Sequence, residues 1–115
     1  MLKKVAFTMF PVQDTSRARR FYEGVLGLQV GSHSSNGIWT EYDLPGGGCL
    51  ALFNSPDKKT ASSPGGASIA FEVEDLDALV DRLKSQGIEF LSTDIESPVC
   101  RMATLKDTEG NTIIL

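Results

Sequence analysis

The pattern of hydrophobic and polar positions repeats itself after 61 residues. The run FTMFPVQD at 7–14 aligns with SIAFEVED at 68–75, and Asp14 falls on Asp75. Each run alternates as a β-strand does, and each ends in an acidic residue that is suited to cap a helix. Internal similarity at a fixed spacing predicts two copies of one supersecondary unit, whose apolar faces are buried against each other.

A helical pattern follows each acidic residue and ends at a glycine. Apolar residues recur at intervals of three and four up to Gly27 in the first copy and up to Gly87 in the second. Each stripe faces a sheet, and each glycine suits the left-handed residue that ends a helix. The stripes consist of Ala18, Phe21, Tyr22, Val25 and Leu26 in the first copy, and of Leu76, Leu79, Val80 and Leu83 in the second.

Short alternating runs joined by turn-forming residues complete each copy. The first copy has a strand from Leu28, a polar hairpin loop at 31–37, and strands at 38–44 and 49–53 around a Pro-Gly-Gly-Gly turn. Each copy therefore reads β-α-β-β-β. The predicted strands of the second copy are 88–91, 101–105 and 112–115, with a loop and an edge strand at 93–99.

This order of elements predicts an α+β fold in which mixed sheets are covered on one face by helices. The opening strand, at 3–13, carries apolar residues on both faces, so we expect it to be covered on each side. A single domain is expected, with module one at 1–53, a linker rich in Ser, Pro and Gly at 54–66, and module two at 67–115. The sequence stops inside its last predicted strand, so either that strand is short or a few residues are missing.

Composition excludes several classes of partner. The formal charge of −4 opposes binding to a phosphate backbone, which depends on Lys and Arg. No apolar run approaches the length of a membrane span, and the opening segment is too short for a signal peptide. A cytoplasmic protein without nucleic-acid or membrane partners is expected. Cys49 and Cys100 lack a CxxC spacing, so we expect buried, reduced thiols.

Three stretches together resemble a known family. They are RRFYEGVLGLQV after the first strand, IAFEVEDLDALVDRLKSQGIEF in the second copy, and KDTEGNTIIL at the end. They are similar to the vicinal oxygen chelate superfamily, which includes glyoxalase I, extradiol dioxygenases, and fosfomycin- and bleomycin-resistance proteins. The most specific phrases are FYEGVLGL and DTEGN, in which Thr108 stands where the family usually has proline. The resemblance implies two modules that curve their sheets into a cup, with helices on the outer face and the ligand inside.

The resemblance also implies four positions for a divalent metal. Carried over residue by residue, they fall on Phe7, Ala51, Ser68 and Ile114. A serine hydroxyl among three apolar side chains cannot supply the oxygen or imidazole ligands of such a site. A shift of the alignment by one residue brings no better ligands to these positions. We therefore expect neither a metal nor any other cofactor.

Candidate ligand contacts follow from the cup that the resemblance implies. Glu41 and Glu72 lie inside predicted strands, where a charge must face water, a cavity or a partner. Trp39 and Met102 hold equivalent places in the two copies and suit either a core or the wall of a ligand pocket. His33, in the predicted hairpin loop, is expected to be solvated. The candidate pocket consists of Phe7, Met9, Trp39, Glu41, Ala51, Ser68, Glu72, Met102 and Ile114.

The leading hypothesis is a metal-free protein that sequesters a drug or metabolite in an apolar cup, as bleomycin-resistance proteins do. The alternative is a lyase, isomerase or dioxygenase-type enzyme in which Glu72 or Glu41 acts as a base in a desolvated pocket. A structural subunit that pairs with an active homologue is a third possibility. No nucleophile with its base appears, so catalytic residues stay unassigned. The two modules can pair within one chain or exchange between two chains. The resemblance favours a homodimer in which both chains build each cup, an arrangement that also buries the sheet edges.

Overall fold

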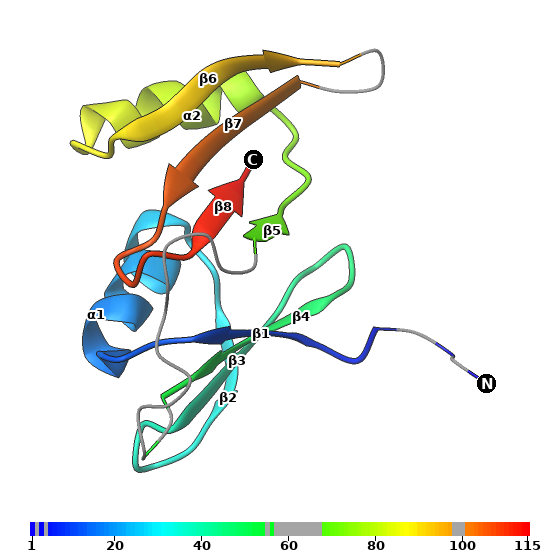
Figure 1. The fold of residues 1–115 in the computed structure, drawn as a ribbon, viewed down its shortest axis with the longest axis vertical. Coiled ribbons are helices and arrows are strands. Elements are labelled where there is room, and N and C mark those ends of the chain that lie inside the picture. Colours follow the sequence, from blue (N-terminus) through cyan, green and yellow to red (C-terminus); the bar gives the residue numbers. More distant parts are fainter. Residues whose placement is uncertain (2, 4, 55, 57–67, 98–100) are drawn as a thin grey trace.

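The chain forms two four-stranded mixed sheets in a computed structural model (Figure 1). The structure describes residues 1, 3, 5–54, 56, 68–97 and 101–115. The first sheet has the order β1(Thr8–Pro11), β4(Cys49–Phe53), β3(Trp39–Asp43) and β2(Val30–His33). The second has the order β5(Ser68–Ala70), β8(Thr112–Ile114), β7(Arg101–Lys106) and β6(Phe90–Glu96). In each sheet the first strand in sequence lies parallel to the last, and the other pairs are antiparallel.

Each sheet carries one helix, as the helical pattern after each capping aspartate predicts. Module one has α1(Thr15–Arg19), which continues as a π-helical segment, η1(Arg20–Val25), and module two has α2(Leu76–Ser85). The carboxylates of Asp14 and Asp75 cap these helices by accepting the amides of Arg17 and Ala78, both at 3.0 Å. The predicted α+β fold of two βαβββ modules is therefore confirmed.

The π-helical segment absorbs one extra residue in module one. The capping residues Asp14 and Asp75 are 61 positions apart, whereas the terminating glycines Gly27 and Gly87 are 60 apart. A helix that must span the same distance with one more residue can widen one turn. The wide turn is visible as the bond from the amide of Leu26 to the carbonyl of Phe21, five residues earlier, at 3.0 Å.

Strand registers show that the two modules are copies. Met9 pairs with Ala51 in the first sheet, and Ala70 pairs with Ile114 at the matching place in the second. The turns between the last two strands also match. The amide of Leu44 donates to the carbonyl of Gly48 at 3.1 Å, and the amide of Asp107 donates to that of Asn111 at 2.9 Å.

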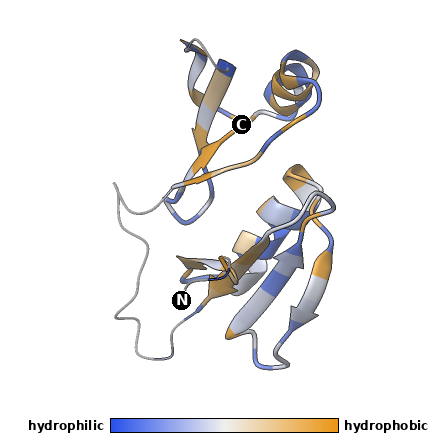
Figure 2. Cartoon of the chain, turned by 90° about the vertical axis from the view of Figure 1, so that its right-hand side faces the viewer, coloured by the Kyte–Doolittle hydropathy of each residue, from blue (hydrophilic) through white to orange (hydrophobic). Residues whose placement is uncertain are grey.

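One hydrophobic core joins the modules. Phe10 and Tyr22 of module one and Leu105 and Ile113 of module two are fully buried in the same cluster. Figure 2 shows the two modules from the side, with the module that holds the C-terminus above the other. The remaining buried members are Val12, Ala18, Phe21, Tyr42, Leu50, Leu52, Leu83 and Leu115.

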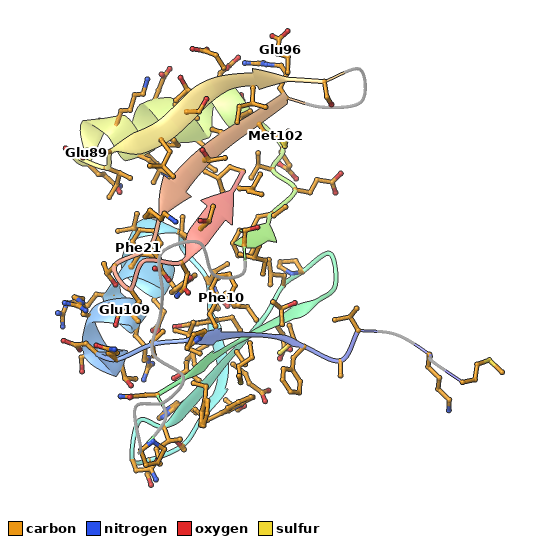
Figure 3. All side chains as sticks on the ribbon, in the orientation of Figure 1. Phe10, Phe21, Glu89, Glu96, Met102 and Glu109 are labelled. Carbon is orange, nitrogen blue, oxygen red and sulfur yellow. The ribbon has the colours of Figure 1, made fainter. Side chains whose placement is uncertain are left out.

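The turn at 107–111, here called the 107–111 latch, fastens module two to module one (Figure 3). Glu109 Oε1 accepts the amides of Gln13 at 3.0 Å and Asp14 at 2.9 Å. Its Oε2 accepts the Arg17 guanidinium Nε at 2.8 Å. Two neighbours complete the latch: Asp107 accepts the hydroxyl of Tyr22 at 2.8 Å, and the Asn111 side-chain amide donates to the carbonyl of Pro11 at 3.2 Å.

Several boundaries and contacts differ from the sequence predictions. The opening strand is shorter than predicted, and one face of it is open, since Phe7 is 47% exposed and Met9 37%. The prediction that this strand is covered on both sides is therefore wrong for the chain by itself. His33 ends a strand instead of lying in a loop, because β2 continues through the residues read as hairpin. Similarly, β6 runs on to Glu96 through much of the predicted loop.

Other predictions concern single residues. Cys49 is free but only half-buried, while Cys100 lies outside the described residues, as does most of the predicted linker. Two arginines of the first helix form ion pairs: Arg17 pairs with Glu109 at 2.7 Å and Arg19 with Glu23 at 2.6 Å. No helix of the described residues is long and apolar enough to cross a membrane.

Candidate functional site

The face of the first sheet that α1 and η1 leave uncovered carries five of the predicted pocket residues. Side chains alternate along a strand, so Phe10, Leu50 and Tyr42 point to the helix and their neighbours point away from it. Met9, Ala51 and Glu41 lie side by side across β1, β4 and β3 on the opposite face. Met9, Glu41 and Ala51 of the predicted pocket therefore share this face, and their role as ligand contacts stays a prediction.

Aromatic rings form the main wall of this face. Phe7 meets Trp39 edge to face, with ring centroids 5.4 Å apart, and Trp39 meets Phe53 at 5.9 Å. We call these three residues the aromatic face. Edge-to-face and tilted contacts are favoured geometries for aromatic pairs and hold these rings in fixed orientations relative to one another. Phe53 was missed by the sequence reasoning, although it alternates with Ala51 in CLALF and could have been found that way.

Glu41 is held beside the aromatic face by two hydrogen bonds. The indole Nε1 of Trp39 donates to its Oε1 at 2.8 Å, and the hydroxyl of Ser32 donates to its Oε2 at 3.3 Å. Each carboxylate oxygen can accept a further bond, so the group is held in place while still able to bind a donor. An apolar surface beside a fixed carboxylate suits a flat ligand that carries one polar donor.

The uncovered face of the second sheet is less apolar. Ser68 lies opposite Thr112, and Ile114 lies between Ala70 and Thr104. Met102 lies on the same face by alternation along β7. The Lys106 ammonium on this face donates to the hydroxyl of Thr112 at 2.7 Å.

Glu72 is separate from the other candidates. It is exposed and lines a cavity of about 770 Å³ where the two modules meet, between the 44–48 turn and the stretch after β5. We call this space the junction cavity. Its described lining is Val5, Thr8, Leu44, Pro45, Gly46, Gly47, Gly48, Cys49, Ile69, Ala70, Phe71, Glu72, Val73 and Glu74. Of the nine predicted pocket residues this cavity includes Glu72 alone, and a catalytic role for Glu72 or Glu41 stays a prediction.

Cys49 borders the junction cavity but is not primed as a nucleophile. Burial raises the pKa of its thiol, and the carboxylates of Glu41 and Asp43 raise it further. The thiolate is the reactive form of cysteine, so these surroundings favour an inert thiol near neutral pH.

The residues at the family's metal positions do not fit a divalent metal. Phe7 and Ala51 lie on the uncovered face of the first sheet, and Ser68 and Ile114 lie on that of the second. Only the serine hydroxyl among them is an oxygen donor. Within the described part of the chain, no three His, Cys, Asp or Glu side chains come close enough together to hold a metal ion. A site for a hard or borderline cation requires several such donors.

Comparison with known families identifies the group to which the fold belongs. The model of the Glyoxalase/Bleomycin resistance protein/Dioxygenase superfamily matches residues 4–115. The chain belongs to this superfamily. A curated relative, the uncharacterized protein YetH of Bacillus subtilis (strain 168), is 25% identical over 118 residues, which cover 100% of this chain and 98% of YetH.

Solved structures of similar fold include both a binding protein and an enzyme. TnmS3, an antibiotic binding protein from Streptomyces sp. CB03234, is 25% identical, with a TM-score of 0.77 over 99% of this chain and 94% of its own. A lactoylglutathione lyase from Agrobacterium tumefaciens has a TM-score of 0.81 over 98% of this chain and 92% of its own, at 18% identity. At that identity the likeness to the lyase shows the fold alone.

Proposed function

We propose that this chain is a metal-free member of its superfamily that binds and sequesters a small molecule, a drug or a metabolite. The observation that carries the proposal is the aromatic face. The family's enzymes hold a metal in the cup, but here Phe7 stands at one of those positions and contacts Trp39. The side chains of this surface therefore suit an apolar ligand rather than a cation.

The antibiotic-binding neighbour supports a binding role. TnmS3 shares the fold across nearly the full length of both chains, and it is described as an antibiotic binding protein. For this chain we propose a ligand of the same kind, an antibiotic-like compound that is flat and mostly apolar and that stacks on Trp39. A hydroxyl or N–H group of the ligand would donate to Glu41, which Trp39 and Ser32 hold in position.

We further propose that two chains form a homodimer and that both contribute to each ligand site. Phe7 and Met9 are large apolar side chains exposed on one face, a pattern typical of a surface that binds a ligand or a partner. Under this arrangement the uncovered face of one chain's second sheet, with Ser68, Met102 and Ile114, closes the site over the partner's aromatic face. A cytoplasmic location for this dimer stays a prediction.

Trp39 provides a direct test because it is the only tryptophan of the chain. The protein is titrated with bleomycin and with a panel of flat polycyclic antibiotics while the emission of Trp39 is recorded. We expect saturable quenching by at least one compound. Phe7→Ala removes a wall of the site and is expected to weaken that binding roughly tenfold, in line with the area of ring that leaves the contact.

Val30→Ala is the matched control, since Val30 is also a large exposed apolar residue, 37% exposed as Met9 is, but pairs with Tyr42 and so lies on the opposite face of the first sheet. It should leave the affinity unchanged. Equal losses in the two variants, or quenching that never saturates with any compound, would contradict the proposed site.

A further inference from the structure

The described residues form two similar junctions between the modules, and among these residues side chains fill the one at 107–111 but not the one at 44–48. The 107–111 turn meets the stretch before α1, and the 44–48 turn faces the corresponding stretch before α2 across the junction cavity. Backbone bonds in the two turns match. The amide of Gly47 donates to Leu44 at 3.0 Å, as that of Gly110 does to Asp107 at 3.5 Å.

The side chains of the latch have no counterpart at the second junction. With the 63-residue spacing of the turns, Gly46 stands where Glu109 would be, and Gly48 stands where Asn111 would be. With the 61-residue spacing of the helices, Ala78 replaces Arg17. Glycine has no side chain to fill the volume that Glu109 and Asn111 fill in the latch. The junction cavity lies at the place in the 44–48 junction that corresponds to these latch side chains.

The described lining of the junction cavity combines apolar and acidic residues. Leu44, Phe71 and Val73 line it, together with the carboxylates of Glu72 and Glu74. Its described lining residues include no Lys, Arg or His. Two acidic residues with no cationic residue among the described lining, beside apolar side chains, favour an occupant with a positive charge and an apolar body.

We propose that the junction cavity is a second binding site and that its ligand is an amphipathic amine. The apolar body packs against Leu44, Phe71 and Val73, and the protonated amine pairs with Glu72 and Glu74. A volume of about 770 Å³ is within the usual range for small-molecule sites. This site is separate from the aromatic face, so the proposal stands independently of the function proposed above.

The test uses three probes of one shape and different charge: 1-naphthylmethylamine, 1-naphthalenemethanol and 1-naphthoate. Each is titrated into the full ¹⁵N-labelled chain, and backbone amide shifts are followed. We expect the amine to shift the amides of residues 46–48 and 72–74 in a saturable way. The neutral alcohol should bind at least tenfold more weakly, and the carboxylate should not bind there.

Two variants test the site by different means. At Gly46 an added Cβ meets nothing within 4 Å and the φ angle is not in the left-handed region, so Gly46→Phe fills the cavity without backbone strain and should abolish amine binding. The double variant Glu72→Gln/Glu74→Gln keeps the shape and should weaken the amine at least tenfold but leave the alcohol unchanged. Its matched control, Glu89→Gln/Glu96→Gln, alters net charge equally at the two ends of β6 (Figure 3). Neither residue lines the cavity, so this variant should retain amine binding.

Four results would overturn the proposal. The alcohol could bind as tightly as the amine, the control double variant could lose as much affinity as Glu72→Gln/Glu74→Gln, or the shifted amides could cluster at Phe7 and Trp39. The amide shifts at 46–48 could also change with protein concentration and not with probe concentration. The occupant would then be a second copy of the chain, and the proposal would likewise be refuted. The Gly46→Phe variant is also titrated with the antibiotics while Trp39 emission is recorded. Quenching of Trp39 that is retained in this variant shows that the aromatic face still binds its ligand, whatever happens at the junction cavity.

Discussion

At the scale of single residues, Glu109 carries the main polar contact between the modules. Its side chain is fully buried. Burial acts to raise the pKa of this carboxyl, but the amides of Asp14 and Gln13 and the guanidinium of Arg17 outweigh it and hold the pKa below its ordinary value. The charged form is therefore the form that the folded protein stabilises.

Glu109→Ala is expected to lower the free energy of unfolding by about 2–4 kcal/mol, because it leaves the amides of Gln13 and Asp14 without their acceptor. Urea denaturation followed by circular dichroism measures the change. Glu96→Ala, at an exposed glutamate on β6, is the control and should change stability by less than about 0.5 kcal/mol. A similar small effect for both variants would show that the latch contributes little.

The sign of the pH dependence follows from the lowered pKa of Glu109. A carboxyl whose pKa is lower in the folded state contributes stability that is present above the ordinary pKa, about 4.3, and is lost as the pH falls through the folded value. The stability difference between the wild type and Glu109→Gln should therefore be complete at pH 7 and shrink below about pH 4. A difference that stays constant from pH 7 to pH 3 would contradict this assignment.

At the scale of elements, the helix of module one combines a wide turn with a glycine in its interior. Gly24 lies in η1, is exposed, and would meet nothing within 4 Å if it carried a Cβ. Gly24→Ala should therefore raise the free energy of unfolding by about 0.5–1 kcal/mol, because alanine loses less backbone entropy in a helix. Thermal unfolding of the two proteins measures this gain.

Gly27→Ala provides the opposite case. Gly27 ends the same helix with a φ of 77°, where a Cβ is strained even though the space around it is open. This variant should be less stable than the wild type. A destabilising effect of Gly24→Ala, or a neutral one of Gly27→Ala, would mean that this helix does not end as described.

The sequence predicted those elements whose signals are local. The alternation in CLALF gave β4 with its observed bounds, and Asp14 and Asp75 cap helices as expected. The π-helical turn was missed because one extra residue in an amphipathic helix does not change the local sequence pattern. It becomes visible only when the spacing of the caps is compared with that of Gly27 and Gly87.

The candidate site was predictable only in part. Met9, Glu41 and Ala51 lie together on one face of the first sheet, as alternation along paired strands requires, because side-chain direction is local. Whether that face is covered depends on how the modules dock, which alternation does not specify. The latch was missed for the same reason, since Glu109 and Gln13 are separated by 96 positions.

At the scale of the whole molecule, the exposed apolar face predicts association. Light scattering on a sizing column at micromolar concentration should give roughly twice the 12.4 kDa mass of the chain. Phe7→Glu places a charge in the apolar site and should shift the mass toward the monomer, whereas Val30→Glu, on the opposite face of the same sheet, should not. A monomer mass for the wild type at all concentrations would show that one chain protects its own edges and builds its site unaided.

The central claim is that this chain has exchanged the metal of its superfamily for an apolar binding surface. Calorimetric titration of the purified protein, stripped with a chelator, with Ni(II), Co(II), Zn(II) and Mn(II) tests it most directly. With Phe7, Ala51, Ser68 and Ile114 at the metal positions, each ion should give only its heat of dilution. The quenching of Trp39 by the ligand should be the same with and without the chelator. Tight binding of one metal ion per site, lost in Ser68→Ala, would contradict it.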